Sequence, residues 1–272
     1  MRMNNSSTKP AAGKRRRRTV RPRGRARFSA VLTLAVATLL PGAAPPPRSA
    51  DESDIVVLLH GLARGPASLA GLERALTRAG YRVLNVPYPS RRKTIERLVA
   101  EDLAPLLKNE LAHETRPVHF VTHSLGGLLV REYLRTPPPF ALGRIVMLAP
   151  PSQGSELADK LGGFALYHWI NGPTGAQLTT GQDGAPARLP VPDCEIGIIV
   201  GTRNVNPLYA RLIPGPNDGK VSVERAKLDG MADFLEVPHS HTWLMCRRSV
   251  QAQVVAFLAS GRFNREEPKP KT

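Results

Sequence analysis

The most constraining feature of this chain is the stretch VHFVTHSLGGLLV at residues 118–130. An apolar run of strand length ends in a His-Ser-Leu-Gly turn and passes directly into an apolar run with helical periodicity. This order predicts a strand that delivers Ser124 to the edge of a sheet, followed by a helix whose first amides point at the serine hydroxyl. Gly126 and Gly127 fit such a close crossing because neither carries a Cβ. Thr122 stands two residues before the serine, where glycine is usual, and its branched side chain works against a tight turn.

Basic residues are unevenly distributed along the 272 residues. The formal net charge is +16, but eleven of the 38 Lys and Arg residues lie in residues 1–27, which contain no Asp or Glu. The rest of the chain holds 27 basic and 22 acidic residues. A nucleic-acid interface needs a concentrated basic surface, which so small a surplus does not supply. We therefore expect no nucleic-acid partner for the folded part.

Residues 1–50 have the composition of a basic leader with an export signal. Arginines precede an apolar stretch at 28–40, and small residues and prolines follow it. The stretch is shorter than the roughly 20 residues that comfortably span a bilayer, which favours a cleaved signal. Pro45 would block cleavage after Ala44, so an uncleaved signal anchor, with residues 28–44 as a membrane tether, stays open.

Either form of the leader places the remainder of the chain beyond the inner membrane. The protein is then periplasmic or secreted, or it is anchored in the inner membrane and faces outward. A basic tail on a cytosolic protein is disfavoured, because a solvated tail is usually poor in apolar residues and this one would expose an apolar stretch to water.

From residue 51 onward the sequence alternates β-branched runs with amphipathic stretches of helix length. This alternation predicts an α/β fold, with a doubly wound, mostly parallel six-stranded sheet and helices on both faces. The predicted strands are 54–59, 81–86, 118–122, 144–148, 195–201 and 233–237, and the predicted helices are 67–79, 94–111, 125–135 and 243–258. We expect one domain at 51–263 and a charged tail at 264–272. Ligand sites in such sheets gather at the carboxyl ends of the strands.

A serine hydroxyl becomes a useful nucleophile only with a base in reach and a carboxylate that orients the base. The expected chain order is serine, acid, histidine. Asp218 lies in the turn PGPNDGKV after the fifth predicted strand, and His241 lies in VPHSHTW after the sixth. Both loops leave the same sheet edge as Ser124, so we select Asp218 and His241 as its partners.

Alternatives to these two residues stay open. His239 competes with His241, which we favour because it lies at the start of the last predicted helix. Asn-Asp-Gly around Asp218 is also an ordinary turn sequence, and Asp229 and Asp233 are the fallback acids. His123 is expected to point away from the serine hydroxyl, because it is the preceding residue in the chain.

The first predicted strand ends in His60-Gly61-Leu62, a loop whose glycine lets the backbone approach the site. The amides of Leu62 and Leu125 are placed to receive a developing oxyanion. His60 is interpreted as a structural hydrogen-bonding residue. The Cys and His residues do not have the spacing of a metal site, and we expect neither metal nor cofactor. Cys194 and Cys246, the latter inside the last predicted helix, are expected to be unpaired thiols.

The segments HGL, THSLGG, NDGKV and SHT together resemble the α/β-hydrolase superfamily, in particular compact bacterial lipase- and esterase-like serine hydrolases. The resemblance covers about residues 54–263. It implies Ser124, Asp218 and His241 as the catalytic triad and the Leu62 and Leu125 amides as the oxyanion hole. It also implies carboxylic-ester hydrolysis through an acyl-enzyme on Ser124, by a monomer acting on a small-molecule or lipid ester.

The interval 150–193 is rich in Gly and Pro and is too long for an ordinary loop. We interpret it as a short lid-like insertion over the strand ends. Its apolar cluster supplies four candidate residues for a substrate pocket: Phe164, Leu166, Tyr167 and Trp169. The alternative is a packing insertion without ligand contact.

Three alternatives for the activity remain at this stage. They are a membrane-lipid acyltransferase on the same triad, a thioesterase on that triad, and a catalytically silent binding protein of the same fold.

Overall fold

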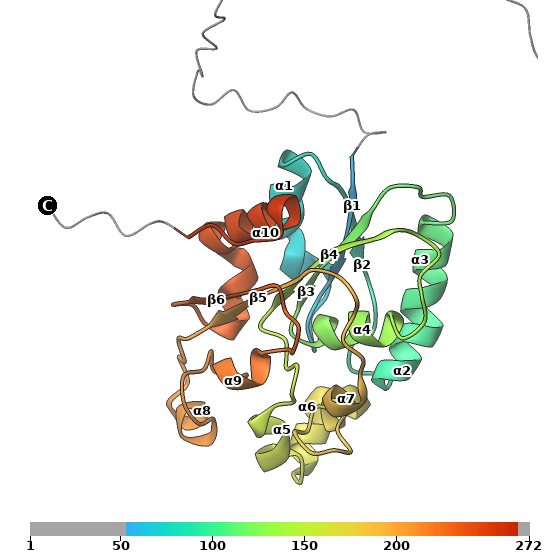
Figure 1. Cartoon of the computed structure of the whole chain (residues 1–272). Helices are drawn as coiled ribbons and strands as arrows, with labels where there is room; N and C mark the ends of the chain where they lie inside the picture. Colours follow the sequence, from blue (N-terminus) through green and yellow to red (C-terminus); the bar gives the residue numbers. More distant parts are fainter. Residues whose placement is uncertain (1–52, 266–272) are drawn as a thin grey trace, which may run out of the picture. The chain divides into compact units, whose positions relative to one another are not determined.

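The computed structural model describes residues 53–265, which form an α/β fold around one parallel sheet (Figure 1). The six strands lie in the order β2-β1-β3-β4-β5-β6, and every neighbouring pair is parallel. Their bounds are β1 Ile55–Leu59, β2 Arg82–Val86, β3 Val118–His123, β4 Leu142–Leu148, β5 Ile196–Gly201 and β6 Asp233–Val237. Each strand coincides with a predicted one to within about two residues, and the predicted fold class is confirmed.

The central strands are apolar on both faces because helices cover both. All five residues of β1 and all six of β3 and of β5 are buried. Continuous Ile, Val and Leu runs are typical of parallel strands buried on two sides. The order of strands reverses between β1 and β3, which makes their carboxyl ends the topological switch point of the sheet.

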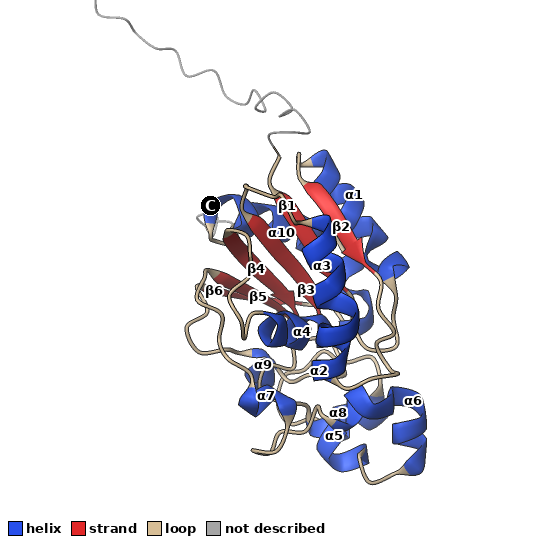
Figure 2. Ribbon diagram, turned by 90° about the vertical axis from the view of Figure 1, so that its right-hand side faces the viewer, coloured by secondary structure: helices blue, strands red, loops and turns tan. Residues whose placement is uncertain are grey.

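Two sets of helices cover the two faces (Figure 2). One face is covered by η2 Pro66–Leu69, α1 Ala70–Arg78, η4 His241–Cys246 and α10 Arg248–Ser260. The other is covered by α2 Ile95–Leu98, the π-helical turn η3 Val99–Leu103, α3 Ala104–Glu110 and α4 Leu125–Tyr133. Side chains alternate along β1, so Val56 and Leu58 join the first core while Ile55, Val57 and Leu59 join the second.

The last helix was predicted at 243–258, and the predicted start is wrong. The chain forms the separate 3-10 helix η4, and Arg247 is extended at φ −81° and ψ 126° before α10 begins. Cys246 therefore lies at the exposed end of η4 and not inside a long helix, and both it and Cys194 are free thiols. The short helices α8 Pro207–Leu212 and α9 Val223–Ala226 were not predicted, because one turn of helix has too little periodicity to read.

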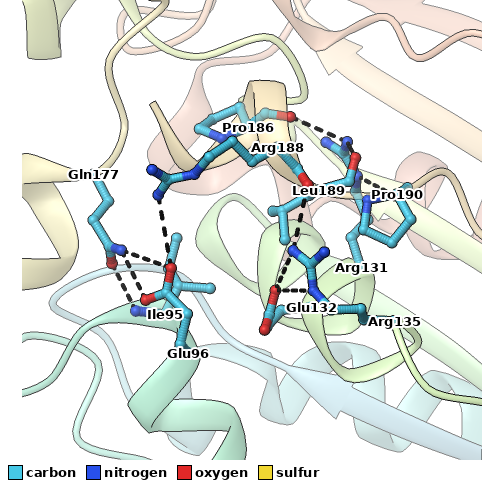
Figure 3. A network of polar contacts seen from close by, with 10 residues as sticks. All are labelled: Ile95, Glu96, Arg131, Glu132, Arg135, Gln177, Pro186, Arg188, Leu189 and Pro190. Carbon is cyan, nitrogen blue, oxygen red and sulfur yellow. Dashed lines mark hydrogen bonds and ion pairs between the residues drawn. The ribbon is translucent and has the colours of Figure 1, made fainter. Parts of the chain in front are cut away.

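The interval 150–193 contains α5 Glu156–Leu161, α6 Ala165–Ala176 and α7 Ala185–Arg188. These helices lie beyond the carboxyl ends of the strands in both views (Figures 1 and 2). Polar contacts attach this insertion to helices α2 and α4, which cover the second face of the sheet (Figure 3). The Gln177 side chain accepts a hydrogen bond from the Ile95 amide at 2.7 Å and donates to Glu96 at 2.8 Å.

Arg131 of α4 anchors the end of this insertion (Figure 3). Its buried guanidinium donates to four carbonyl oxygens, those of Ser152, Pro186, Leu189 and Pro190, at 2.5 to 3.2 Å. Burial lowers the pKa of Arg131 to about 10. Backbone carbonyl dipoles compensate this buried charge, and together they hold the chain that returns to β5.

The predicted leader at 1–50 and most of the predicted tail at 264–272 lie outside the described residues. Within residues 53–265, no helix has both the length and the apolarity to cross a membrane.

Candidate active site

Ser124 occupies the turn between β3 and α4 with an unusual backbone conformation. Its φ is 53° and its ψ is −117°, a region that non-glycine residues enter only when the surrounding structure enforces it. Its amide is hydrogen-bonded to the Leu148 carbonyl of the neighbouring strand at 2.8 Å. Thr122, buried within β3, does not prevent this turn.

The packing after the serine requires glycine. A Cβ on Gly126 would lie 2.4 Å from the carbonyl oxygen of Leu59 in β1, so α4 approaches the sheet more closely than any side chain allows. This contact holds the first turn of α4 beneath Ser124.

Asp218 in the loop after β5 and His241 in the loop after β6 are in direct contact. The Asp218 Oδ2 accepts a hydrogen bond from His241 Nδ1 at 2.7 Å, and both side chains are buried. The other carboxylate oxygen, Oδ1, accepts hydrogen bonds from the Lys220 and Val221 amides, each at 2.9 Å. With Nδ1 bound to the carboxylate, Nε2 is the imidazole nitrogen left for chemistry.

Ser124 and His241 line one cavity of about 440 Å³ at the carboxyl ends of β1 and β3. Among residues 53–265, the structure gives no direct hydrogen bond between the serine hydroxyl and the imidazole. Such a bond is often long in an empty site and tightens when substrate binds. The described geometry thus pairs the His241 imidazole with the Asp218 carboxylate and places Ser124 at the same cavity.

The other candidate histidines and acids are elsewhere. His239 Nε2 lies 3.4 Å from Ser249 Oγ and does not line the cavity. Asp229 is exposed. Asp233 begins β6 and pairs with Arg265 at 2.6 Å, which places it at the amino end of its strand.

His123 is a member of the site that sequence reasoning missed. The sequence assigned it no part in the site, but His123 belongs to the cavity lining and its ring lies 4.9 Å from the His241 ring. Its Nε2 is 3.1 Å from the His241 carbonyl oxygen. Burial and then the neighbouring His241 hold the pKa of His123 well below its ordinary value, so this ring stays neutral and supports the backbone of His241.

His60 is structural, as the sequence suggested. Its Nδ1 is hydrogen-bonded to the Gly61 carbonyl at 3.0 Å, and its ring stacks on Tyr88 at 3.9 Å. The Tyr88 hydroxyl donates to the His60 carbonyl, which ties the loop after β1 to the chain after β2.

Leu62 and Leu125 follow β1 and β3, on the two sides of the switch point. Among the described residues, neither of their amides donates a hydrogen bond. Leu125 is the first residue of α4, where amides lack partners within the helix. Both amides are free to bind a ligand oxygen.

Apolar side chains from the insertion form one wall of the cavity. Of the four candidate pocket residues, Phe164, Leu166 and Tyr167 line the cavity, whereas Trp169 does not and is 80% exposed. The residues that complete this wall were not predicted: Leu157, Leu161, Ile170 and Leu178. Within residues 53–265 no group of three or more His, Cys, Asp or Glu side chains is arranged to hold a metal ion.

The strand order and the placement of the serine between β3 and α4 are the organisation of α/β hydrolases. A sequence model described as "Alpha/beta hydrolase family" matches residues 56–260. The chain therefore belongs to the alpha/beta hydrolase family.

Solved structures of hydrolases share this fold. The mature form of the Bacillus licheniformis lipase BlEst2 is 17% identical, with a TM-score of 0.60 over 82% of this chain and 96% of that one. Its propeptide form gives 18% identity and a TM-score of 0.62 over 83% of this chain, which spans only 53% of that longer chain.

Phospholipase PlaB from Legionella pneumophila is 18% identical, with a TM-score of 0.54 over 64% of this chain and 46% of that one. At these identities the likeness concerns the fold. A comparison with curated proteins gives no significant match.

Proposed function

We propose that this protein is a serine hydrolase that cleaves carboxylic esters through an acyl-enzyme on Ser124. The observation that carries the proposal is the Asp218–His241 hydrogen bond at the cavity that Ser124 lines. A carboxylate on Nδ1 holds the imidazole in the tautomer whose Nε2 accepts a proton, as a general base for serine requires.

In the first half of the reaction, Ser124 Oγ attacks the ester carbonyl carbon while His241 Nε2 takes the hydroxyl proton. The carbonyl oxygen becomes an oxyanion in the tetrahedral intermediate, and the free amides of Leu62 and Leu125 supply its hydrogen bonds. The carbon–oxygen bond to the alcohol then breaks. The imidazolium returns its proton to the departing alcohol, which leaves the acyl group on Ser124.

In the second half, water takes the place of the alcohol. His241 removes a proton from the water as it attacks the acyl-enzyme, and the same amides stabilise the second intermediate. Collapse releases the carboxylic acid and restores the Ser124 hydroxyl with the proton from His241. Asp218 remains ionised throughout and stabilises the imidazolium that forms twice in each cycle.

Covalent labelling tests this proposal. A fluorophosphonate is expected to modify the wild-type protein once, on Ser124, and to leave a Ser124→Ala variant unmodified. Hydrolysis of a p-nitrophenyl ester is expected to fall by several orders of magnitude in the same variant. Ser152, which is buried in the insertion, serves as a control in Ser152→Ala. A wild-type protein that neither labels nor turns over any ester would contradict the proposal and favour a silent binding protein.

Two further assays separate the related activities. An acyltransferase would direct the acyl group to an added alcohol beyond the proportion set by water and alcohol concentrations, whereas a hydrolase would follow that proportion. A thioesterase would prefer a thioester over an oxygen ester of the same acyl chain. We expect neither deviation, because the cavity opens to solvent and water has access to the acyl-enzyme.

We also propose that the chain is exported and acts beyond the inner membrane. The support is the order of basic, apolar and small residues in 1–50. Residues 1–50 fused to a reporter that folds only in an oxidising compartment are expected to give an active reporter. An inactive reporter would contradict export, and the mass of the mature N-terminus would separate a cleaved signal from a retained anchor.

A further inference from the structure

Two cations line the polar end of the cavity without a partner. Arg64 follows β1, two residues after Leu62, and Lys220 follows Asp218 by two residues; both belong to the cavity lining. Among residues 53–265, neither side chain forms an ion pair or a hydrogen bond. The lining includes no Asp or Glu. The cavity lining therefore carries two positive charges and no carboxylate.

The two charges act on each other. Desolvation and then the nearby Arg64 guanidinium lower the pKa of Lys220, although its side chain still reaches solvent, and only Asp218 acts in the opposite sense. Arg64 and Lys220 also contribute to the lowered pKa of His123 beside them. Like charges held close together in a partly desolvated cavity are unfavourable. A bound anion would relieve this repulsion.

Other buried or half-buried cations of the fold are compensated. Arg131 donates to four carbonyl oxygens, Arg116 pairs with Glu114 at 2.8 Å, and Lys93 pairs with Asp102 at 2.5 Å. Arg64 is half-buried and Lys220 is exposed, and neither side chain has such a partner among residues 53–265. Their position beside the Leu62 amide and the Asp218 turn puts them at the reacting end of the cavity.

Another part of the cavity lining is apolar. It consists of the apolar side chains of α5, α6 and the chain after α6, which belong to the insertion at 150–193. A ligand that satisfies both ends has an apolar chain on one side of its ester bond and a negative charge on the other. The apolar wall suits the acyl chain, which leaves the cations to the alcohol portion.

We propose that Arg64 and Lys220 form an anion subsite, and that the substrates are fatty-acyl esters whose alcohol portion carries a phosphate or a carboxylate. This inference rests on the proposed ester hydrolysis and names its substrate class. The guanidinium binds two oxygens of either group, and the ammonium adds a second positive charge. Each charge-assisted hydrogen bond is worth about 10- to 100-fold in affinity.

Three octanoyl esters with the same acyl chain test the subsite: monooctanoylglycerol, octanoylglycerol 3-phosphate and an octanoyl ester of glycerate. Each is measured below its micelle concentration. We expect kcat/KM for at least one anionic ester to exceed that for the neutral ester by about 10-fold or more. Preference for both anions indicates a general anion subsite, and preference for one assigns the group; either result supports the proposal.

The variant R64Q/K220Q is expected to reduce the ratio of anionic to neutral kcat/KM to near one. The matched control is R74Q/K108Q, which removes the same two charge types from exposed positions on α1 and α3. That control separates the subsite from the effect of net charge and should keep the wild-type ratio.

Three outcomes would overturn the proposal. They are a wild-type protein without preference for either anionic ester, a preference that survives in R64Q/K220Q, and a preference equally lost in R74Q/K108Q. A preference for a half-ester with the carboxylate on its acyl chain, and for neither anionic alcohol, would reject the alcohol assignment.

Binding separates this inference from the proposed function. If no ester is hydrolysed and no fluorophosphonate labels the protein, catalysis fails while the subsite remains measurable. Calorimetry on Ser124→Ala should then show tighter binding of octanoylglycerol 3-phosphate than of monooctanoylglycerol, with the difference removed in the triple variant that adds R64Q/K220Q. Equal binding of the two esters would reject the subsite by itself.

Discussion

Asp218 and His241 are linked twice, once through their side chains and once through their backbones. Oδ2 accepts from Nδ1 at 2.7 Å, and the His241 amide donates to the Asp218 carbonyl oxygen at 2.9 Å. The backbone bond brings together the loop after β5 and the loop after β6. It therefore fixes the distance between carboxylate and imidazole independently of the side-chain bond.

This double link makes Asp218→Asn an informative substitution. The backbone bond should keep the loops together, while the amide no longer stabilises the imidazolium or selects its tautomer. We expect kcat to fall by about 10⁴-fold, as is typical of this change in a triad. Ester hydrolysis and thermal unfolding measured in parallel will separate the chemical loss from misfolding.

Asp229→Asn is the matched control, because Asp229 is an exposed acid before β6. It should retain wild-type kcat. A loss of less than tenfold in Asp218→Asn, or an equal loss in both variants, would contradict the role given to Asp218.

The apolar wall predicts chain-length selectivity. Leu166 and Trp169 are both exposed residues of α6, but only Leu166 lines the cavity. Leu166→Ala removes apolar contact with a long acyl chain, worth about 1 kcal/mol, so kcat/KM for an octanoate ester should fall about fivefold. A butyrate ester should be affected less.

Trp169→Ala provides the comparison within the same helix. It should leave the ratio of octanoate to butyrate kcat/KM within about twofold of the wild type. If Trp169→Ala shifts this ratio as strongly as Leu166→Ala does, the boundaries assigned to the wall are incorrect.

Arg131→Met should destabilise the fold strongly. The substitution keeps an unbranched apolar stem but leaves the carbonyls of Ser152, Pro186, Leu189 and Pro190 without their shared donor. A buried acceptor left unsatisfied costs about 1–3 kcal/mol, so the unfolding free energy should fall by about 3 kcal/mol or more. Urea unfolding at constant pH measures the change.

Arg135 lies two residues beyond the end of α4, with a half-exposed side chain bound to Glu132 and to the Arg188 carbonyl. Arg135→Gln should change the unfolding free energy by no more than about 0.5 kcal/mol. Similar losses of unfolding free energy in the two variants would show that the contact of Arg131 with four carbonyls stabilises the fold no more than the exposed contacts of Arg135 do.

His123 makes stability depend on pH. Its folded-state pKa lies below the unfolded value of about 6.5, because burial and His241 disfavour the charged ring. The unfolded chain then binds more protons below that pH, so the stabilisation is complete above it and is lost as pH falls. One such group contributes a slope of at most ~1.4 kcal/mol per pH unit.

His123→Gln should reduce the slope of unfolding free energy between about pH 6.5 and 5. The buried His60 and His119 have lowered pKa values as well and act in the same direction, so part of the slope remains. His113→Gln, at an exposed position, is the control. An unchanged slope in His123→Gln would mean that His123 is not held neutral by the fold.

Local patterns predicted most of the fold. The six strands and the serine turn were visible because apolar runs of strand length have one strong interpretation when both sheet faces are covered. The boundary at Arg247 was not visible, because 243–258 is amphipathic throughout and the break depends on how η4 packs after His241. The network around Arg131 was equally hidden, since a single arginine in a helix gives no sign of which carbonyls it meets.

The order of the elements, the position of Ser124 at a strand end, and the two loops that supply a carboxylate and an imidazole follow from the sequence pattern alone. Folding in three dimensions brings Asp218 to His241 rather than to His239, packs His123 against His241, leaves Trp169 facing solvent, and places Arg64 and Lys220 at one cavity. The physical reason is the separation of the interacting residues along the chain. Strand and helix patterns arise from neighbours along the chain, whereas these contacts join residues 23 to 156 positions apart and depend on the paths of several loops at once.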